Sequence, residues 1–340
     1  MLHVCLLTLA TFFVSSLLEG GTYAYHYAKA DDNALPPSTQ ETLTPRPSFA
    51  PFASLLDGTN VLLLGVAGYP YPAPDFADSI MVGSFKGDLL TLTLTSLPRD
   101  LLVSVGDTGR FAKINSLYAL GKTFSPLDPQ RFIKEKVEEI TGLPIPYVAL
   151  IDVKGLETIV DALGGVDIAV EENIADPFFP GPHYSYDPFY VEKGVHHLNG
   201  KDAVRFARSR HSVRGDFDRV RHQQQLLAAL RNSLHANAQL ATLALDLFSQ
   251  LGNHLITNIT LKDVPLFLGG LLSPEMRITH RVIEDGPNGL LKQFHTQDGA
   301  YALVPNAGID EYSEIQGFFN QNPNAQMPMS NKIPSPNVQN

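Results

Sequence analysis

Cysteine is almost absent from this chain of 340 residues, which contains a single one, Cys5. One cysteine excludes an intramolecular disulfide and any zinc site built on cysteine ligands. Because Cys5 lies in an apolar N-terminal run, we expect it to pack in lipid. Basic residues are also in the minority, with 25 Lys and Arg against 35 Asp and Glu and a net charge of −10. This balance argues against a nucleic-acid partner, which requires a basic face.

The N-terminal run, residues 4–18, contains no charged residue. At about 1.5 Å per residue it barely spans the roughly 30 Å hydrocarbon core of a bilayer. Residues 1–30 are therefore either a membrane anchor or a signal segment cleaved at an A-x-A-like site, residues 28–30. We favour the anchor, because the site lies far beyond the apolar run and no Lys or Arg precedes that run. Both interpretations place the remainder outside the cytoplasm, and the anchor makes it a single-pass protein of the cell membrane.

No repeat of fixed period is present, and composition divides the rest of the chain. Residues 31–55 are rich in Pro, Ser and Thr, which predicts an extended spacer. Residues 320–340 are predicted to be a disordered tail. Between them we expect a main domain at residues 56–235 and a C-terminal extension of it at residues 236–319. The pattern leaves open whether the extension packs on the same core.

Strand and helix patterns alternate within the main domain. Apolar runs predict strands at residues 60–66, 78–85, 89–97, 147–152 and 166–170. Amphipathic segments predict helices at residues 129–142, 153–165, 199–210 and 216–236. We expect Asp128, Asn199 and Asp216 to be N-caps and Gly142 to end the first helix. This alternation predicts one large α/β domain with helices on both faces of a sheet.

Arginines gather in residues 204–225, where six fall within seventeen positions: Arg205, Arg208, Arg210, Arg214, Arg219 and Arg221. On the predicted helix that begins after Asp216, Arg219 and Gln223 follow at i+3 and i+7 and share one face. The free N–H groups and the dipole at a helix start favour an anion.

Arg208 and Arg210 end the preceding predicted helix, and a short loop would fold them back toward the same place. The planar fork of arginine holds phosphate oxygens in two bonds, so these residues predict a phosphate site. The alternative is a solvated surface on which arginines pair with aspartates.

Polar residues elsewhere favour the phosphate site. Arg99 and Asp100 directly follow a buried strand, and ligands collect at the carboxyl ends of strands in open α/β sheets. Lys113 and Asn115 follow just before an apolar turn, as further candidates for binding the substrate.

Two carboxylates complete the pattern. Asp78 begins a predicted strand and Asp75 lies three residues before it. Carboxylates near several arginines predict a divalent metal, Mg²⁺ or Mn²⁺, that faces phosphates.

These pieces together resemble the LytR-CpsA-Psr phosphotransferases, over about residues 60–230. The matching segments are "ADSIMV", "LTSLPRDLLVSV", "KINSLYALG", "ITGLPIPYVALIDVKGLETIVDALGGVDIAV" and "GVHHLNGKDAVRFARSRHSVRGDFDRVRHQQQ". The resemblance implies a three-layer α/β/α sandwich around a central mixed sheet, with residues 56–235 as the catalytic domain. It also implies an apolar pocket for the polyprenyl chain of a lipid-linked glycan.

The resemblance further implies roles for individual residues. Pyrophosphate-binding arginines would be Arg99, Arg208, Arg210 and Arg219, with Asp216, Gln223 and Lys113 in support, and Asp78 would hold magnesium. The sequence departs from the family at Phe76, where many members have arginine, and at Ala67, where many have a second metal carboxylate. Asp75 substitutes from the loop, or phosphate and water supply more of the metal's ligands.

The implied reaction is transfer of a glycan phosphate from a polyprenyl-pyrophosphate carrier onto peptidoglycan. A sugar hydroxyl attacks the phosphorus and polyprenyl phosphate leaves, so positioning and charge neutralisation dominate. Asp100 or Asp216 either takes the hydroxyl proton or only orients an arginine. Two alternatives stay open: hydrolysis of the same pyrophosphate by water, and non-catalytic binding of anionic envelope glycans or lipids.

Two further features have open interpretations. His196 and His197 are interpreted as a helix-entry feature rather than a metal site. The loop at residues 176–194 is rich in aromatic residues and proline, and either stacks against sugars or only packs on the domain as a lid.

Overall fold

The computed structural model describes residues 56–86, 91–209, 250–260 and 276–320, with further positions at 222, 225–226, 229–230, 232–233, 263 and 267. The predicted anchor or signal segment, the spacer and all of the tail except Asn320 lie outside the described residues, as do Arg210, Asp216, Arg219 and Gln223. In the described part of the chain, no helix combines the length and the apolar character that a membrane crossing requires.

A six-stranded sheet forms the centre of the molecule, in the order β11-β6-β1-β2-β3-β12. The strands are β1 (Asn60–Val66), β2 (Ala77–Lys86), β3 (Thr91–Leu97), β6 (Tyr147–Asp152), β11 (Leu255–Thr257) and β12 (Arg277–Val282). β1, β2 and β3 are antiparallel neighbours, while β6 runs parallel to β1 and β12 parallel to β3. The sheet is therefore mixed, as expected, and β11 and β12 show that part of residues 236–319 joins it. The boundaries between main domain and extension stay predictions.

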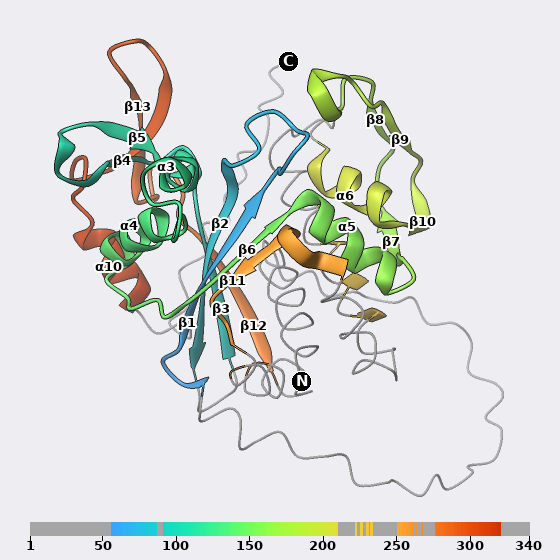
Figure 1. Ribbon diagram of the computed structural model, residues 1–340, viewed down its shortest axis with the longest axis horizontal. Coiled ribbons are helices and arrows are strands. Elements are labelled where there is room, and N and C mark those ends of the chain that lie inside the picture. Colours follow the sequence, from blue (N-terminus) through green and yellow to red (C-terminus); the bar gives the residue numbers. More distant parts are fainter. Residues whose placement is uncertain are drawn as a thin grey trace, which may run out of the picture.

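Helices cover both sides of this sheet, which confirms the three-layer prediction (Figure 1). On one side lie α3 (Leu117–Phe124), α4 (Arg131–Thr141) and α10 (Ser313–Asn320), and on the other α5 (Val153–Ala162) and α6 (Gly200–Arg208). Alternate residues of β1 supply the two faces: Leu62 and Leu64 pack in the core with α3, α4 and α10, and Val61 and Leu63 pack in a separate core. The continuous apolar run of β1 is thus buried on both faces.

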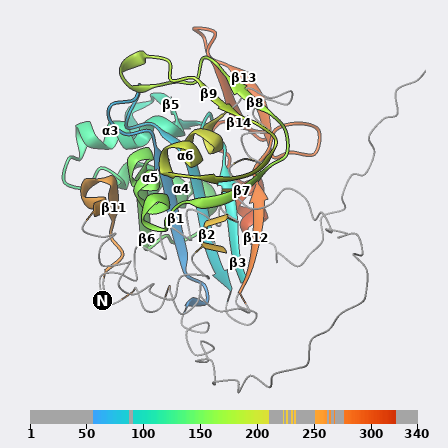
Figure 2. The ribbon, with the colours of Figure 1, turned by 90° about the vertical axis from the view of Figure 1, so that its right-hand side faces the viewer.

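Small two-stranded sheets extend from the layers (Figure 2). They pair β4 (Leu102–Ser104) with β5 (Phe111–Lys113), β7 (Val166–Val170) with β10 (Gly194–Leu198), β8 (Ile174–Asp176) with β9 (Phe189–Val191), and β13 (Leu291–His295) with β14 (Tyr301–Pro305). Short 3₁₀ helices are η1 (Gly106–Thr108), η2 (Ile114–Ser116), η3 (Pro182–Tyr184) and η4 (Gly252–His254).

The helix ends test the predicted caps. The Asn199 side chain accepts a hydrogen bond from the backbone N–H of Asp202 at 2.9 Å, so this cap of α6 is confirmed. Gly142 ends α4 in the left-handed conformation, with φ of 69°, also as expected. The prediction for Asp128 is wrong, because α4 begins at Arg131 and its cap position is Gln130. Asp128 belongs to the preceding turn, where its backbone N–H donates to the Ser125 carbonyl.

Candidate functional site

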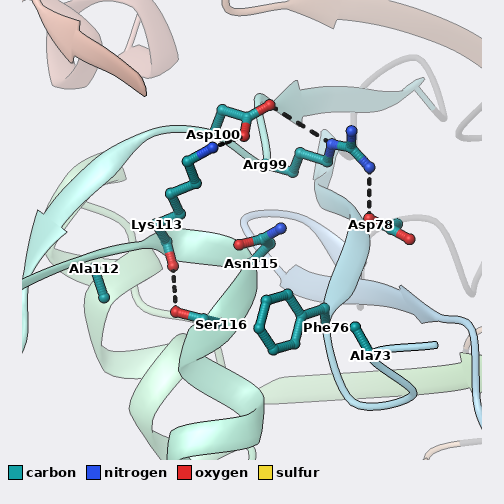
Figure 3. A pocket seen from close by; sticks show the side chains of 9 residues that line it. All are labelled: Ala73, Phe76, Asp78, Arg99, Asp100, Ala112, Lys113, Asn115 and Ser116. Carbon is teal, nitrogen blue, oxygen red and sulfur yellow. Dashed lines mark hydrogen bonds and ion pairs between the residues drawn. The ribbon is translucent and has the colours of Figure 1, made fainter. Parts of the chain in front are cut away.

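A cavity of about 530 Å³ opens where β3 ends and β2 begins. The β2–β3 register explains why charged residues meet there. Ile80 lies opposite Leu97 in this antiparallel pair, so Asp78 and Arg99, each two residues further out, come together. The lining residues are Ala73, Phe76, Asp78, Arg99, Asp100, Ala112, Lys113, Asn115 and Ser116 (Figure 3).

Four of the predicted residues form a row of alternating charge in this cavity (Figure 3). Arg99 Nη1 donates to Asp78 Oδ1 at 2.7 Å, and Arg99 Nε lies 3.6 Å from Asp100 Oδ2. Lys113 Nζ donates to the other oxygen, Asp100 Oδ1, at 2.7 Å. Their side chains are 25 to 51% exposed. Ion pairs in contact with water contribute only about 0–1 kcal/mol each, so an anionic ligand can replace the carboxylate partners at small cost.

Backbone hydrogen bonds hold the segment that contains Lys113 and Asn115 beside the segment that contains Arg99. The N–H of Ile114 donates to the Leu101 carbonyl at 2.8 Å, and the N–H of Asn115 donates to the Arg99 carbonyl at 3.3 Å. Lys113 and Asn115 therefore face the same cavity as Arg99, although they lie 14 and 16 positions after it in the chain.

Asn115 is 8% exposed, and its Oδ1 has no hydrogen-bond partner among the residues that the structure describes. An unpaired buried polar group costs about 1–3 kcal/mol, which a donor of a ligand in the cavity would recover.

The two predicted metal carboxylates lie in different surroundings. Asp78 lines the cavity, whereas Asp75 does not and instead accepts from Lys122 Nζ of α3 at 2.8 Å. Across the described residues, no group of three His, Cys, Asp or Glu side chains is placed to hold a metal. This donor set fits only a cation that takes most of its ligands from phosphate and water, as Mg²⁺ does.

The sequence matches the LytR_cpsA_psr family over residues 22–284. The chain belongs to this family. TagU of Bacillus licheniformis, named a polyisoprenyl-teichoic acid–peptidoglycan teichoic acid transferase, is 30% identical over 189 residues, 55% of this chain and 56% of TagU. The match thus spans about half the length of that relative.

Solved structures share the fold of this LytR_cpsA_psr chain. Bacillus subtilis TagV is 23% identical with a TM-score of 0.58, and the alignment covers 78% of this chain and 96% of TagV. A structure described as TagT bound to LIIa-WTA is 20% identical with a TM-score of 0.54, covering 77% of this chain and 89% of TagT. At these identities the likeness shows the fold.

Arg208 contacts the β1–β2 loop, which also contributes residues to the cavity lining. Its guanidinium carbon is 4.8 Å from the ring centre of Tyr71 and 5.5 Å from that of Phe179. Tyr71 belongs to the β1–β2 loop, whose residues Ala73 and Phe76 line the cavity. The structure thus places Arg208 against the same loop but not on the cavity wall. Convergence of the remaining predicted arginines stays a prediction, because they lie outside the described residues.

The paired histidines of this LytR_cpsA_psr chain lie on strand β10, so their interpretation as a helix-entry feature is wrong. His197 bonds through Nδ1 to Asp167 Oδ1 and through Nε2 to the Gly164 carbonyl, both at 2.8 Å. The Asp167 bond and then the Gly164 bond raise the pKa of His197. His196 Nε2 lies 2.7 Å from the Glu192 carbonyl. Both rings therefore tie strands and turns together.

Sequence reasoning missed one pair at the carboxyl end of β6. Asp152 Oδ2 lies 2.7 Å from His254 Nδ1, while its Oδ1 accepts from the Gly155 N–H and caps α5. No sequence signal joins Asp152 to His254, because the two residues lie 102 positions apart.

The charge of Asp152 also acts on Tyr118 of α3. Burial raises the pKa of this tyrosine most, and the charges of Asp75 and Asp152 raise it further.

Asp187 attaches the loop at residues 176–194 to α6. Lys201 Nζ is 3.3 Å from its Oδ2, and the Arg205 guanidinium pairs with its Oδ1. Burial raises the pKa of Asp187, but the bonds to Arg205 and Lys201 outweigh it and hold the pKa below the ordinary 3.8. The ionised Asp187 therefore stabilises the fold at pH values above its ordinary pKa. This contribution is lost as the pH falls through the lowered pKa.

We expect less than about 1 kcal/mol from this attachment, because the Asp187 side chain is partly exposed. The free energy of unfolding in urea should fall on acidification by a larger amount in the wild type than in Asp187→Asn. An equal acid-dependent loss in both proteins would contradict the assignment.

Proposed function

We propose that this chain transfers a glycan phosphate from a polyprenyl-pyrophosphate carrier onto peptidoglycan, outside the cytoplasm. The observation that carries the proposal is the Asp78–Arg99–Asp100–Lys113 row, which faces a cavity in a LytR_cpsA_psr fold. The name of the relative TagU, a transferase that joins teichoic acid from a polyisoprenyl carrier to peptidoglycan, supports the same reaction.

The cations act on the diphosphate. Arg99 is fixed at the end of β3 and Lys113 at the end of β5, so both present positive charge to one cavity. In a site of this kind the protein positions the reacting groups and neutralises the charge of the transferred phosphoryl group. The sugar hydroxyl of the acceptor attacks the phosphorus that bears the glycan, and the polyprenyl phosphate leaves with the bonding electrons.

Asp100 acts by orienting the cations. One of its oxygens accepts from Lys113 at 2.7 Å and the other lies 3.6 Å from Arg99, so it holds the two cations apart at a fixed spacing. Asn115, buried beside them, would donate its side-chain N–H to the glycan phosphate, while its Oδ1 would accept from a hydroxyl of the glycan. Of the two candidate bases, Asp216 would remove the proton, because Asp100 is already shared between two cations.

Asp78 would hold Mg²⁺ when the diphosphate is bound. The ion would supply charge neutralisation on the phosphate oxygens. Arg99 would then exchange its bond with Asp78 for one with phosphate. Residues 1–30, as an anchor in the cell membrane, would keep the domain beside its lipid-linked substrate.

Product analysis tests the proposal. The full chain is incubated with a polyprenyl-pyrophosphate glycan, Mg²⁺ and a peptidoglycan oligomer, and the products are identified by mass. We expect an oligomer heavier by one glycan phosphate, together with polyprenyl monophosphate. Release of polyprenyl phosphate and free glycan phosphate, without any change in the oligomer, would establish a pyrophosphatase. Binding of the carrier without release of polyprenyl phosphate would establish a non-catalytic binder.

A further inference from the structure

Four large aromatic side chains are exposed on the β1–β2 loop, which lines the cavity, and on the turn bonded to it. Aromatic side chains usually stabilise a protein most when they are buried. Three belong to a tight turn, residues 178–186, and the fourth is Tyr69 of the β1–β2 loop. We call this group the aromatic tip. The exposed fractions are 61% for Phe178, 84% for Tyr184, 67% for Tyr186 and 80% for Tyr69.

The turn holds these rings outward. Within it, the Gly181 N–H donates to the Ser185 carbonyl at 2.8 Å, and the rings of Phe178 and Tyr186 pack edge to face at 5.5 Å. Tyr184 has a φ of 60°, in the left-handed region that costs a residue with a side chain about 1–2 kcal/mol. The fold therefore maintains a strained backbone that leaves the Tyr184 ring in solvent.

The aromatic tip is fastened to the loop that walls the cavity. The His183 N–H donates to the Pro70 carbonyl at 3.0 Å, and the His183 ring packs edge to face on Tyr69 at 5.8 Å. Phe179, next in sequence to the exposed Phe178, turns inward and lies under the Arg208 guanidinium. Phe178 of this segment is therefore exposed, while its neighbour Phe179 is buried against Arg208 of α6.

The charge around the aromatic tip decides which partner fits. Residues 167–193 contain six acidic side chains, Asp167, Glu171, Glu172, Asp176, Asp187 and Glu192, against the single basic Lys193. Lys201 and Arg205 pair with Asp187 and His197 pairs with Asp167, and the balance stays negative after these three cations are counted. Such a segment repels both a phosphate-rich polymer and an anionic bilayer. Tyrosine rings with hydroxyl ends instead match the faces of neutral sugars, whose C–H groups are apolar and whose hydroxyls are polar.

We propose that the aromatic tip binds the acceptor, a neutral strand of β-linked N-acetylhexosamines, and delivers its hydroxyl to the phosphate site. This inference rests on the proposed function, since only a transferase needs an acceptor. The strand stacks on Tyr184 and Tyr186 and runs along the β1–β2 loop toward the cavity. The carrier diphosphate occupies the cavity itself, so donor and acceptor have separate sites.

The full chain tests this with chitohexaose, a neutral β-linked N-acetylglucosamine hexamer, as the probe in calorimetry. The double variant Tyr184→Ala/Tyr186→Ala should weaken binding by roughly tenfold or more, from the loss of two stacking contacts. Phe124→Ala, which removes an aromatic ring of α3 that is 67% exposed, is the matched control and should bind like the wild type. In the transfer assay the double variant should raise the concentration of peptidoglycan oligomer needed for half-maximal rate, with carrier binding unchanged.

Unchanged chitohexaose affinity in the double variant, or no binding by the wild type, would overturn the inference and leave the proposed function standing. Loss of binding to phosphatidylglycerol vesicles in the double variant, with chitohexaose binding retained, would assign the aromatic tip to the membrane and also overturn it. A double variant that loses glycan binding while the wild type transfers nothing would refute the proposed function but retain a glycan site.

Discussion

Replacing Arg99 with alanine is expected to reduce transfer by about 10²–10³-fold, because one fixed cation that stabilises developing charge contributes on that scale. Arg99 lies between Asp78 and Asp100, at 2.7 and 3.6 Å, and links the two carboxylates. The Arg99→Ala variant therefore loses a diphosphate ligand and leaves two carboxylates in the cavity without the cation that links them. Carrier affinity should fall with the rate.

The fold itself should tolerate this change, because the Arg99 side chain is 31% exposed and pairs of this kind contribute less than about 1 kcal/mol. Transfer rate and urea unfolding are measured on the same preparations. Arg131→Ala is the matched control, since it removes an exposed arginine that pairs with Glu135 on α4, outside the cavity lining. Arg99→Lys should recover part of the charge but not the two-bond geometry. Turnover near the wild-type rate in Arg99→Ala would contradict the proposed phosphate site.

Local patterns predicted the elements well where burial alone determines them. The apolar run at residues 60–66 predicted a strand covered on both faces, and Asn199 predicted the start of a helix. Both elements lie where expected. Asp128 failed as a cap because Asp, Ser and Pro in this segment also form turns, and the turn that begins at Ser125 engages Asp128 before the helix starts.

The sequence predicted those site residues that directly follow a strand. Arg99 and Asp100 were expected at a strand terminus, and the antiparallel pairing of β2 with β3 brings Asp78 opposite Arg99. The pairing of Asp75 with Lys122, by contrast, depends on where α3 packs, which no local pattern encodes. The bond between Asp152 and His254 depends on β11 pairing with β6, an even longer-range event.

Truncation of a buried side chain in the core that packs against α6 is expected to lower stability more than any other change proposed. Phe206 of α6 is fully buried, in a cluster with residues of α5, β7, β9 and β10, and its ring lies 4.5 Å from that of His222. Replacing it with alanine leaves a cavity between layers, so Phe206→Ala should lower the free energy of unfolding by about 3–5 kcal/mol. A domain of ordinary stability has only about 5–15 kcal/mol in total, so much of this reserve would be lost.

The same substitution should act on function through α6. Arg205 and Arg208 both lie on this helix, the first fastening Asp187 and the second lying against Tyr71 and Phe179. Urea unfolding measures the loss of stability, and carrier affinity, measured below the unfolding transition, reports the displaced Arg208. Phe206→Leu, which retains an apolar side chain, should lose much less, and Val195→Ala, at a residue 78% exposed on β10, should lose almost nothing. If Phe206→Ala unfolds at the wild-type urea concentration, the Phe206 ring does not hold α6 in place, and the expected displacement of Arg208 is contradicted as well.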